Sequence, residues 1–181
     1  MHERGHHVEV LTTKPKEEHA ASEQIELFLS VGQCLIAARR YEAAEEVLAP
    51  LLADRARVFG PDHPTVLVTR GHLAKTMGLS GRHEEALFIF GRLLTDRTRL
   101  LGPDDESTLA TRGNIALVLL QAGRVDEAIA MYEALLADRS EILGENHYDT
   151  IATEDNLWSA RLMLPNPSVA IDAMIDRARA L

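Results

Sequence analysis

The sequence LLADRARVFGPDH occupies residues 51–63, and close copies of it follow as LLTDRTRLLGPDD at residues 93–105 and LLADRSEILGENH at residues 135–147. Each copy begins 42 residues after the previous one. An ungapped alignment of residues 51–92 with residues 93–134 gives 17 identities in 42 positions. A fixed period of this length indicates stacked supersecondary units, none of which buries its apolar face alone. The spacing therefore predicts a repeat array.

Each period contains two amphipathic stretches. Apolar residues recur at helical spacing over residues 108–122 and again over residues 125–143. Gly123 stands between them and is expected to end the first helix in the left-handed conformation. Gly102 and Gly144 are expected to end the second helices in the same manner. The side chains expected to cap the first helices are Asp62, Asp104 and Asn146, with Pro64 in the first turn of its helix.

The segment TRGNIALVLLQAGRVDEAIAMYEALLADRSEILG resembles a tetratricopeptide repeat, and the 42-residue period with LGPDD and TLATRGNIA is similar to the kinesin light chain subtype. The resemblance covers residues 22–180. It implies an all-α, right-handed superhelical solenoid of about four helical hairpins, or eight helices. Three features recur in register: a small residue at the helix crossing (Gly32, Ala74, Ala116), the turn glycine (Gly81, Gly123) and an alanine of the second helix (Ala44, Ala86, Ala128, Ala170).

The predicted units span residues 22–60, 61–102, 103–144 and 145–181, and residues 1–21 are expected to be a flexible tail with a short β-like run at 8–12. The end units depart from the pattern, as terminal repeats commonly do. In the first unit, Arg39 replaces the turn glycine. In the last unit, Trp158 takes the small-residue position, and Ile171, Met174 and Ile175 are expected to pack inward on it.

Charge and composition narrow the classes of function. A net charge of −9 argues against sequence-independent binding of nucleic acid or anionic membranes, which requires clustered Lys and Arg. The single cysteine, Cys34, cannot form an internal disulfide, and no stretch of 18 apolar residues is present. We therefore expect a cytoplasmic protein that binds neither nucleic acid nor membrane.

The candidate chemical groups favour a protein without catalytic activity, metal or cofactor. His2, His6 and His7 could bind a metal, but a flexible tail supplies no fixed geometry. Cys34 aligns with small or medium side chains and has no nearby group that would activate a thiolate. The recurring Asp-Arg pairs, such as Asp96 and Arg97, are interpreted as solvated or inter-repeat ion pairs.

Resemblance to the family places a binding groove on the first helices. It would contain Leu29, Gln33 and Ile36 in the first unit, Gly71, Lys75, Gly78 and Leu79 in the second, Gly113, Leu117, Leu120 and Gln121 in the third, and Asp155, Ser159 and Leu162 in the fourth. The glycines are expected to leave room and the leucines to supply apolar anchors, unless the leucines pack between hairpins instead. His72, Asn114 and Asn156 would contact a ligand or, as the favoured alternative, tie adjacent units together.

The predicted function is a non-catalytic scaffold that binds a peptide or helix of another protein in this groove. One alternative is a sensor domain that binds a short peptide or small apolar ligand. The other is an enzyme that uses the groove as a pocket, which requires titratable residues that the sequence does not bring together. The chain is expected to be a monomer or to self-associate weakly.

Overall fold

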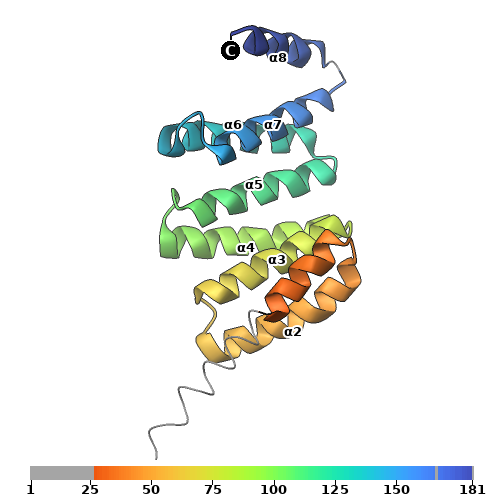
Figure 1. Ribbon diagram of the computed structural model, residues 1–181, viewed down its shortest axis with the longest axis vertical. Helices are drawn as coiled ribbons and strands as arrows, with labels where there is room; N and C mark the ends of the chain where they lie inside the picture. The colour runs from red at the N-terminus through yellow and green to blue at the C-terminus, as the bar shows by residue number, and fades with distance from the viewer. Residues whose placement is uncertain (1–26, 166, 181) are drawn as a thin grey trace, which may run out of the picture.

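The computed structural model describes residues 27–165 and 167–180, and these residues form helices and turns with no strand. First helices lie at residues 27–37, α3 (Pro64–Leu79), α5 (Glu106–Gln121) and α7 (Tyr148–Leu162). Second helices are α2 (Tyr41–Phe59), α4 (His83–Leu101), α6 (Val125–Leu143) and α8 (Ser168–Ala180). Figure 1 shows them stacked in chain order along the long axis, as expected for an all-α helical repeat superhelix. The predicted tail at 1–21 and its β-like run lie outside the described residues.

The turn inside each hairpin has the same geometry in the first three units. Arg39, Gly81 and Gly123 have φ values of 58°, 88° and 77°. The next residue's amide then donates to the carbonyl five residues earlier, for example Arg82 to Met77 at 2.9 Å, as in a Schellman motif. The prediction that Arg39 occupies the place of the turn glycine is confirmed. It does so at a cost, because a residue with a Cβ atom is strained in this region.

The helix N-caps lie one residue later than predicted. Asp62, Asp104 and Asn146 do not cap α3, α5 and α7. Instead, Oδ1 of Asp105 accepts from the amide of Ser107 at 2.9 Å, and Nδ1 of His63 and of His147 accept from amides two residues on. An imidazole nitrogen can satisfy a free helix amide as a carboxylate does, which sequence rules centred on Asp, Asn, Ser and Thr overlook.

The expected left-handed ending of the second helices is also incorrect in detail. Gly102 has φ 97° and ψ 164°, and Gly144 has φ 91° and ψ 156°. This combination lies outside the left-handed helical region, in a part of conformational space that is accessible essentially only to glycine. The chain therefore leaves α4 and α6 in an extended direction that leads to the next first helix.

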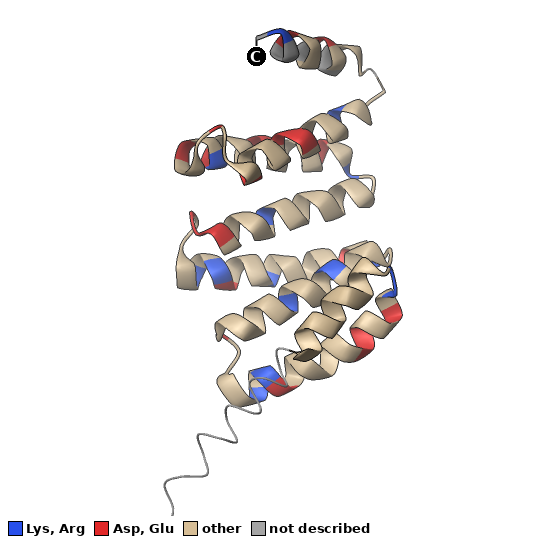
Figure 2. Cartoon of the chain, in the orientation of Figure 1, with Lys and Arg blue, Asp and Glu red and all other residues tan. Residues whose placement is uncertain are grey.

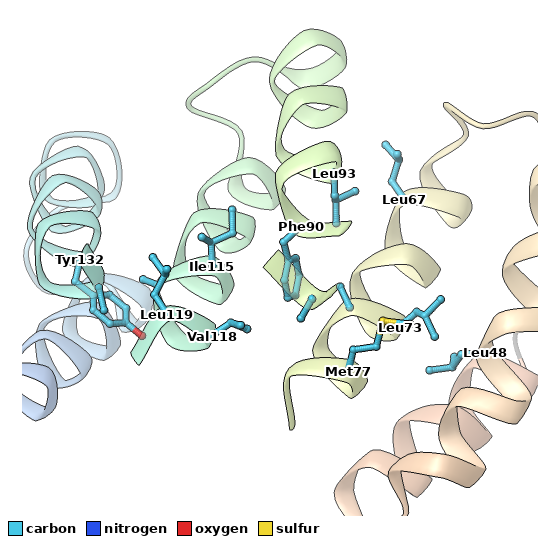
Figure 3. Close-up of a cluster of buried hydrophobic side chains, with 14 of the residues drawn as sticks. Leu48, Leu67, Leu73, Met77, Phe90, Leu93, Ile115, Val118, Leu119 and Tyr132 are labelled. Atoms are coloured by element: carbon cyan, nitrogen blue, oxygen red, sulfur yellow. The ribbon is translucent and has the colours of Figure 1, made fainter. Parts of the chain in front are cut away.

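The core runs continuously between the stacked hairpins. Figure 3 shows Phe90 of α4 directed between α3 and α5, with Leu73 and Met77 on one side and Ile115 and Leu119 on the other. Tyr132 occupies the same repeat position in α6. A small residue is required where the two helices of a hairpin cross: a Cβ atom added to Gly32 would lie 2.6 Å from Cδ2 of Leu48. Burial of this apolar surface is the main stabilising term for the array.

A buried arginine joins each unit to the next. Nη1 of Arg97 in α4 donates to the carbonyl of Ser107 and to Oγ1 of Thr111 in α5, both at 2.8 Å. The same bonds recur from Arg55 and from Arg139. The interpretation of the Asp-Arg pairs as ion pairs is therefore wrong for Arg97 and Arg139, which bind neutral oxygens. Burial accordingly lowers the pKa of Arg97 and of Arg139.

The neighbouring aspartates pair within their own hairpins instead. Arg70 of α3 reaches Asp96 of α4, and Arg112 of α5 reaches Asp138 of α6, each with a separation of 2.5 Å. The Asp96-Arg97 and Asp138-Arg139 dipeptides thus each serve two contacts: the aspartate binds the first helix of its own hairpin, and the arginine binds the next first helix. Asp54 differs, because it pairs with Arg57 of its own helix.

The last helix contradicts the prediction made for it. Ile171, Met174 and Ile175 are exposed rather than packed on Trp158, and α8 packs on α7 much less extensively than α4 packs on α3 or α6 on α5. Trp158 is half-buried, and its ring lies under the guanidinium of Arg161, 5.0 Å from the ring centroid. The large indole at the crossing position is consistent with this looser contact.

Candidate binding face

The first helices present one recurring set of positions away from the core. We call the first-helix face the set formed by His72, Lys75 and Leu79 of α3, Asn114, Leu117 and Gln121 of α5, and Asn156 and Ser159 of α7. The spacing of three and four residues places each set on one side of its helix. Because α3 packs on α5 and α5 on α7, the sets lie in rows across the array. All eight residues are exposed or half-buried.

The face continues onto the first helix of the array. The side-chain amide of Gln33 donates to Nε2 of His72, with a separation of 3.0 Å. Burial, then the positive charges of Lys75, Arg97 and Arg55, lower the pKa of His72. His72 is therefore neutral at physiological pH, which leaves Nε2 free to accept this bond. Lys75 supplies the cationic charge of the face in α3.

The predicted apolar anchors divide into two groups. Leu29 is buried in the core, and Ile36 and Leu120 pack against the core cluster. Their assignment to the groove is corrected: these three follow the alternative in which the side chains pack between hairpins. Leu79 and Leu117 are half-buried and lie outside that cluster. They are the apolar side chains that the first-helix face offers to a ligand.

The glycines do not leave the room that was expected. A Cβ atom on Gly78 would lie 2.9 Å from Cγ2 of Val118 in the next first helix. Cβ atoms on Gly71 and Gly113 would lie 3.4 Å from the side chains of Leu93 and Leu135. These positions allow helices to approach closely and do not open the surface.

The fourth unit makes the face more polar. Asp155, Asn156 and Ser159 are exposed, Leu162 is exposed at the end of α7, and Oγ of Ser159 donates to the carbonyl of Asp155 at 2.9 Å. Within residues 27–165, the side chains of Asn114 and Asn156 make no hydrogen bond to a neighbouring unit. The inter-unit role favoured for these asparagines is therefore not observed.

An apolar hollow of about 250 Å³ borders this face between the second and third units. Its walls include Pro64, Leu67 and Val68 of α3 and Leu100 and Leu101 of α4, and Arg97 and Ser107 lie beside them. Val68 lies four residues before His72 and so extends the same side of α3. This hollow was not predicted from the sequence, although the repeated apolar pair before each glycine (VFG, LLG, ILG) was a signal for it.

Other kinds of site find little support in the described part of the chain. It holds no group of three or more histidine, cysteine, aspartate or glutamate side chains that could bind a metal. None of the helices in that part has the length and apolar character needed to cross a membrane. In the view of Figure 2, basic residues are spread over several helices rather than gathered on one.

Comparison with known proteins agrees with this geometry. The family model for the tetratricopeptide repeat matches residues 23–99 and 105–174, more than half of the chain. A search of curated proteins found no match. Two similar solved structures are the kinesin light chain-like, nearly identical TPR-like repeats of Podosopora anserina (TM-score 0.68, 21% identity) and BtubC (BKLC) from P. vanneervenii (TM-score 0.70, 20% identity).

The match to these structures is one of fold, and it is partial. The alignment covers 76% of this chain and 65% of the Podosopora anserina chain, and 86% of this chain and 62% of BtubC. The chain thus spans less than two thirds of the length of either. The recurring hairpins, the buried arginines between units and the family match together show that the chain belongs to the tetratricopeptide repeat family.

Proposed function

We propose that this chain is a non-catalytic scaffold that binds a peptide or helix of a partner protein along the first-helix face. Tetratricopeptide repeats generally mediate protein–protein interaction, and members of the family are typically not enzymes. The observation that carries the proposal is the position of Leu79 and Leu117. Both are half-buried apolar side chains on adjacent first helices, and neither packs against the core.

The geometry suggests how a bound segment would be held. Leu79 and Leu117 provide the apolar contact, flanked by the exposed side chains of Lys75 and Gln121. An apolar centre with a polar rim is the usual arrangement of a protein interface. Asn114 and Asn156 have unused amide groups one turn away, suited to the backbone of an extended or helical ligand.

The hollow beside Val68 favours a side chain of the partner over a free small molecule. At about 250 Å³ it is smaller than ordinary ligand pockets, which measure roughly 300–1,000 Å³. It is large enough for one apolar side chain of a bound peptide. The sensor alternative therefore gains no support from the hollow alone.

The proposal is tested by affinity capture from the source cell, followed by calorimetry with the purified partner. The test variant is Leu79→Glu with Leu117→Glu, which places two carboxylates on the apolar centre of the face. The matched control is Phe88→Glu, which alters an exposed aromatic side chain on α4. We expect the double variant to weaken binding at least about tenfold, because an apolar partner group must then meet an unpaired charge.

The control variant should bind as the wild type does, and circular dichroism should show the same helix content for all three proteins. Retention of the partner by the double variant together with its loss from Phe88→Glu would place the interaction on the outer surface and refute the assignment.

A further inference from the structure

A buried cation borders the hollow between the second and third units. Arg97 lines this hollow of about 250 Å³ and is only 9% exposed. Within residues 27–165, both of its hydrogen bonds start at Nη1, which donates to the carbonyl of Ser107 and to Oγ1 of Thr111. The N–H groups of Nε and Nη2 therefore have no acceptor in that part of the chain. They lie side by side along one edge of the guanidinium, where they can bind both oxygens of one carboxylate.

The next interface of the array supplies negative charge that this one lacks. Arg139 makes the same hydrogen bonds to the first helix that follows it. Burial lowers the pKa of Arg139, and the nearby charges of Asp149 and Glu106 oppose that shift. Forty-two residues before these two acids, the sequence has Ser107 and Pro64, and both line the hollow. The arginine beside the hollow thus lacks two carboxylates that are present at the equivalent places one repeat later.

The carboxylates that remain near Arg97 have other partners. Burial lowers the pKa of Arg97 and Asp105 opposes this shift, but Oδ1 of Asp105 accepts from the amide of Ser107 at 2.9 Å. Asp62 lines the hollow and binds Arg99, with a separation of 2.8 Å. Arg97 itself forms no ion pair with a carboxylate of residues 27–165. A cation that is buried without a counter-ion is costly, so an anion that enters the hollow would be stabilised there.

The other walls of the hollow are apolar and partly open to solvent. Val68, Leu100 and Leu101 are 38%, 39% and 47% exposed, and Pro64 and Leu67 lie beside them. These walls suit a hydrocarbon group, because contact with it removes apolar surface from water. A ligand that uses the whole hollow therefore combines a short aliphatic group with an anionic group. A carboxylate fits better than a phosphate, whose second negative charge would face the carboxylate at the rim of the hollow.

We propose that the hollow binds a carboxylate carried on a short aliphatic group, whose two oxygens accept from Nε and Nη2 of Arg97. The inference rests on the proposed function, because the segment bound on the first-helix face would supply this group. An acidic side chain within the segment has the required chemistry, and so does the α-carboxylate of an aliphatic residue at the segment's C-terminus. Either would fix one end of the segment beside Val68 and so set the direction in which the segment crosses the face.

Small analogues of the two groups test the site without the partner. N-acetyl-glutamate α-amide represents an acidic side chain, and N-acetyl-leucine represents an aliphatic C-terminus. Their controls, N-acetyl-glutaminamide and N-acetyl-leucinamide, have the same bodies without the carboxylate. Each compound is titrated at neutral pH into the whole isotope-labelled chain, and NMR follows the amide shifts of the residues around the hollow.

We expect at least one of the two acids to bind at least about tenfold more tightly than its own amide, because hydrogen bonds to a charged group contribute more than a tenfold difference requires. The shifts should be centred on Val68, Leu101 and Ser107. The acid that binds identifies the source of the carboxylate, either a side chain within the segment or the end of a chain.

A variant copied from the next repeat tests the role of Arg97 directly. Pro64→Glu introduces the side chain found at Glu106, in the first turn of α3, where a negative charge is favourable. Its carboxylate should pair with Arg97 and compete with the acid. Pro64→Gln removes the same ring without adding charge, so it should bind the acid at least about tenfold more tightly than Pro64→Glu does. Phe88→Glu adds the same charge on the outer surface of α4 and should leave binding unchanged.

The outcome for the hollow can be separated from the outcome for the first-helix face. The Leu79→Glu, Leu117→Glu protein has an intact hollow, so it should bind the acid as the wild type does even when it loses the partner. If neither acid binds, if the amides bind as tightly as the acids, or if Pro64→Glu and Pro64→Gln bind the acid equally, the inference is overturned. Loss of the partner from the double variant would still support the proposed function in each of these cases.

Discussion

The buried arginine between units offers a quantitative test of what holds the array together. In the central interface, Nη1 of Arg97 binds Oγ1 of Thr111 and the carbonyl of Ser107, both at 2.8 Å. Arg97→Met keeps most of the aliphatic length and removes both hydrogen bonds. Thr111→Val keeps the shape of the side chain and removes the acceptor. Together the two changes form a double-mutant cycle across the interface.

The magnitudes follow from the groups involved. A hydrogen bond from a charged donor contributes roughly 1.5–3 kcal/mol, but Arg97→Met also removes the cost of burying a cation, so we expect a net loss of about 2 kcal/mol. Thr111→Val leaves the guanidinium with one acceptor fewer and should cost about 1–2 kcal/mol. The double variant should lose at least about 1 kcal/mol less stability than the sum of the two single variants. In the double variant both the guanidinium and the threonine hydroxyl are gone, so neither group is left buried without its partner.

Urea denaturation followed by circular dichroism gives these free energies, provided that the slope of the transition is the same for all four proteins. If the losses of stability from the two single variants were strictly additive, or if Arg97→Met were more stable than the wild type, the view that the arginine stabilises the contact between adjacent units would be refuted. It would show instead that the cost of burying the cation exceeds the value of its hydrogen bonds.

Three further changes copy a residue from one repeat into another or remove an unpaired group. Tyr132→Phe copies Phe90 and removes a buried hydroxyl without a hydrogen-bond partner, so urea denaturation should show a free energy of unfolding that is higher by about 1 kcal/mol. The same burial raises the pKa of Tyr132 to about 12, so the phenol of the wild-type protein should titrate at correspondingly high pH when followed by absorbance. Arg39→Gly relieves the positive φ and should also stabilise the protein by about 1 kcal/mol in the same assay; an unchanged or lower stability would contradict this account of the turn. His72→Asn, which copies Asn114, should change the pH dependence of the melting temperature. The folded state lowers the pKa of His72, so the unfolded chain takes up the proton first and the wild type should lose stability as the pH falls below about 6.5, whereas the variant should lose less.

Much of the fold could be predicted because the repeat multiplies weak local signals. One copy of LLADRARVFG would indicate only a helix end, but three copies in register determine the order and pairing of the helices. The details that failed depend on single hydrogen bonds. The N-cap lies at Asp105 rather than Asp104, and the two residues are identical, so only the backbone direction after Gly102 distinguishes them.

The binding face was harder to predict because helical periodicity does not say how much of a side chain a neighbouring unit covers. Leu117 and Leu120 lie one turn apart on α5, and both fit a groove by spacing alone. The structure packs Leu120 against the core and leaves Leu117 outside it. The prediction for α8 was wrong for a related reason: Ile171 and Met174 have the apolar spacing of a packed helix, but spacing alone does not say how closely α8 packs on α7.

Equivalent positions of the repeats can be compared within this one chain, and they differ in whether the side chain joins two units or lies on the first-helix face. Where a side chain joins units, the copies agree: Arg55, Arg97 and Arg139 all bind a threonine of the next helix. On the first-helix face the copies differ, since the position of Lys75 becomes Leu117 and then Ser159. Packing imposes no common residue there, because these side chains contribute little to the core. Residues on this face can therefore change without unfolding the array, which is the freedom that recognition of a particular partner requires.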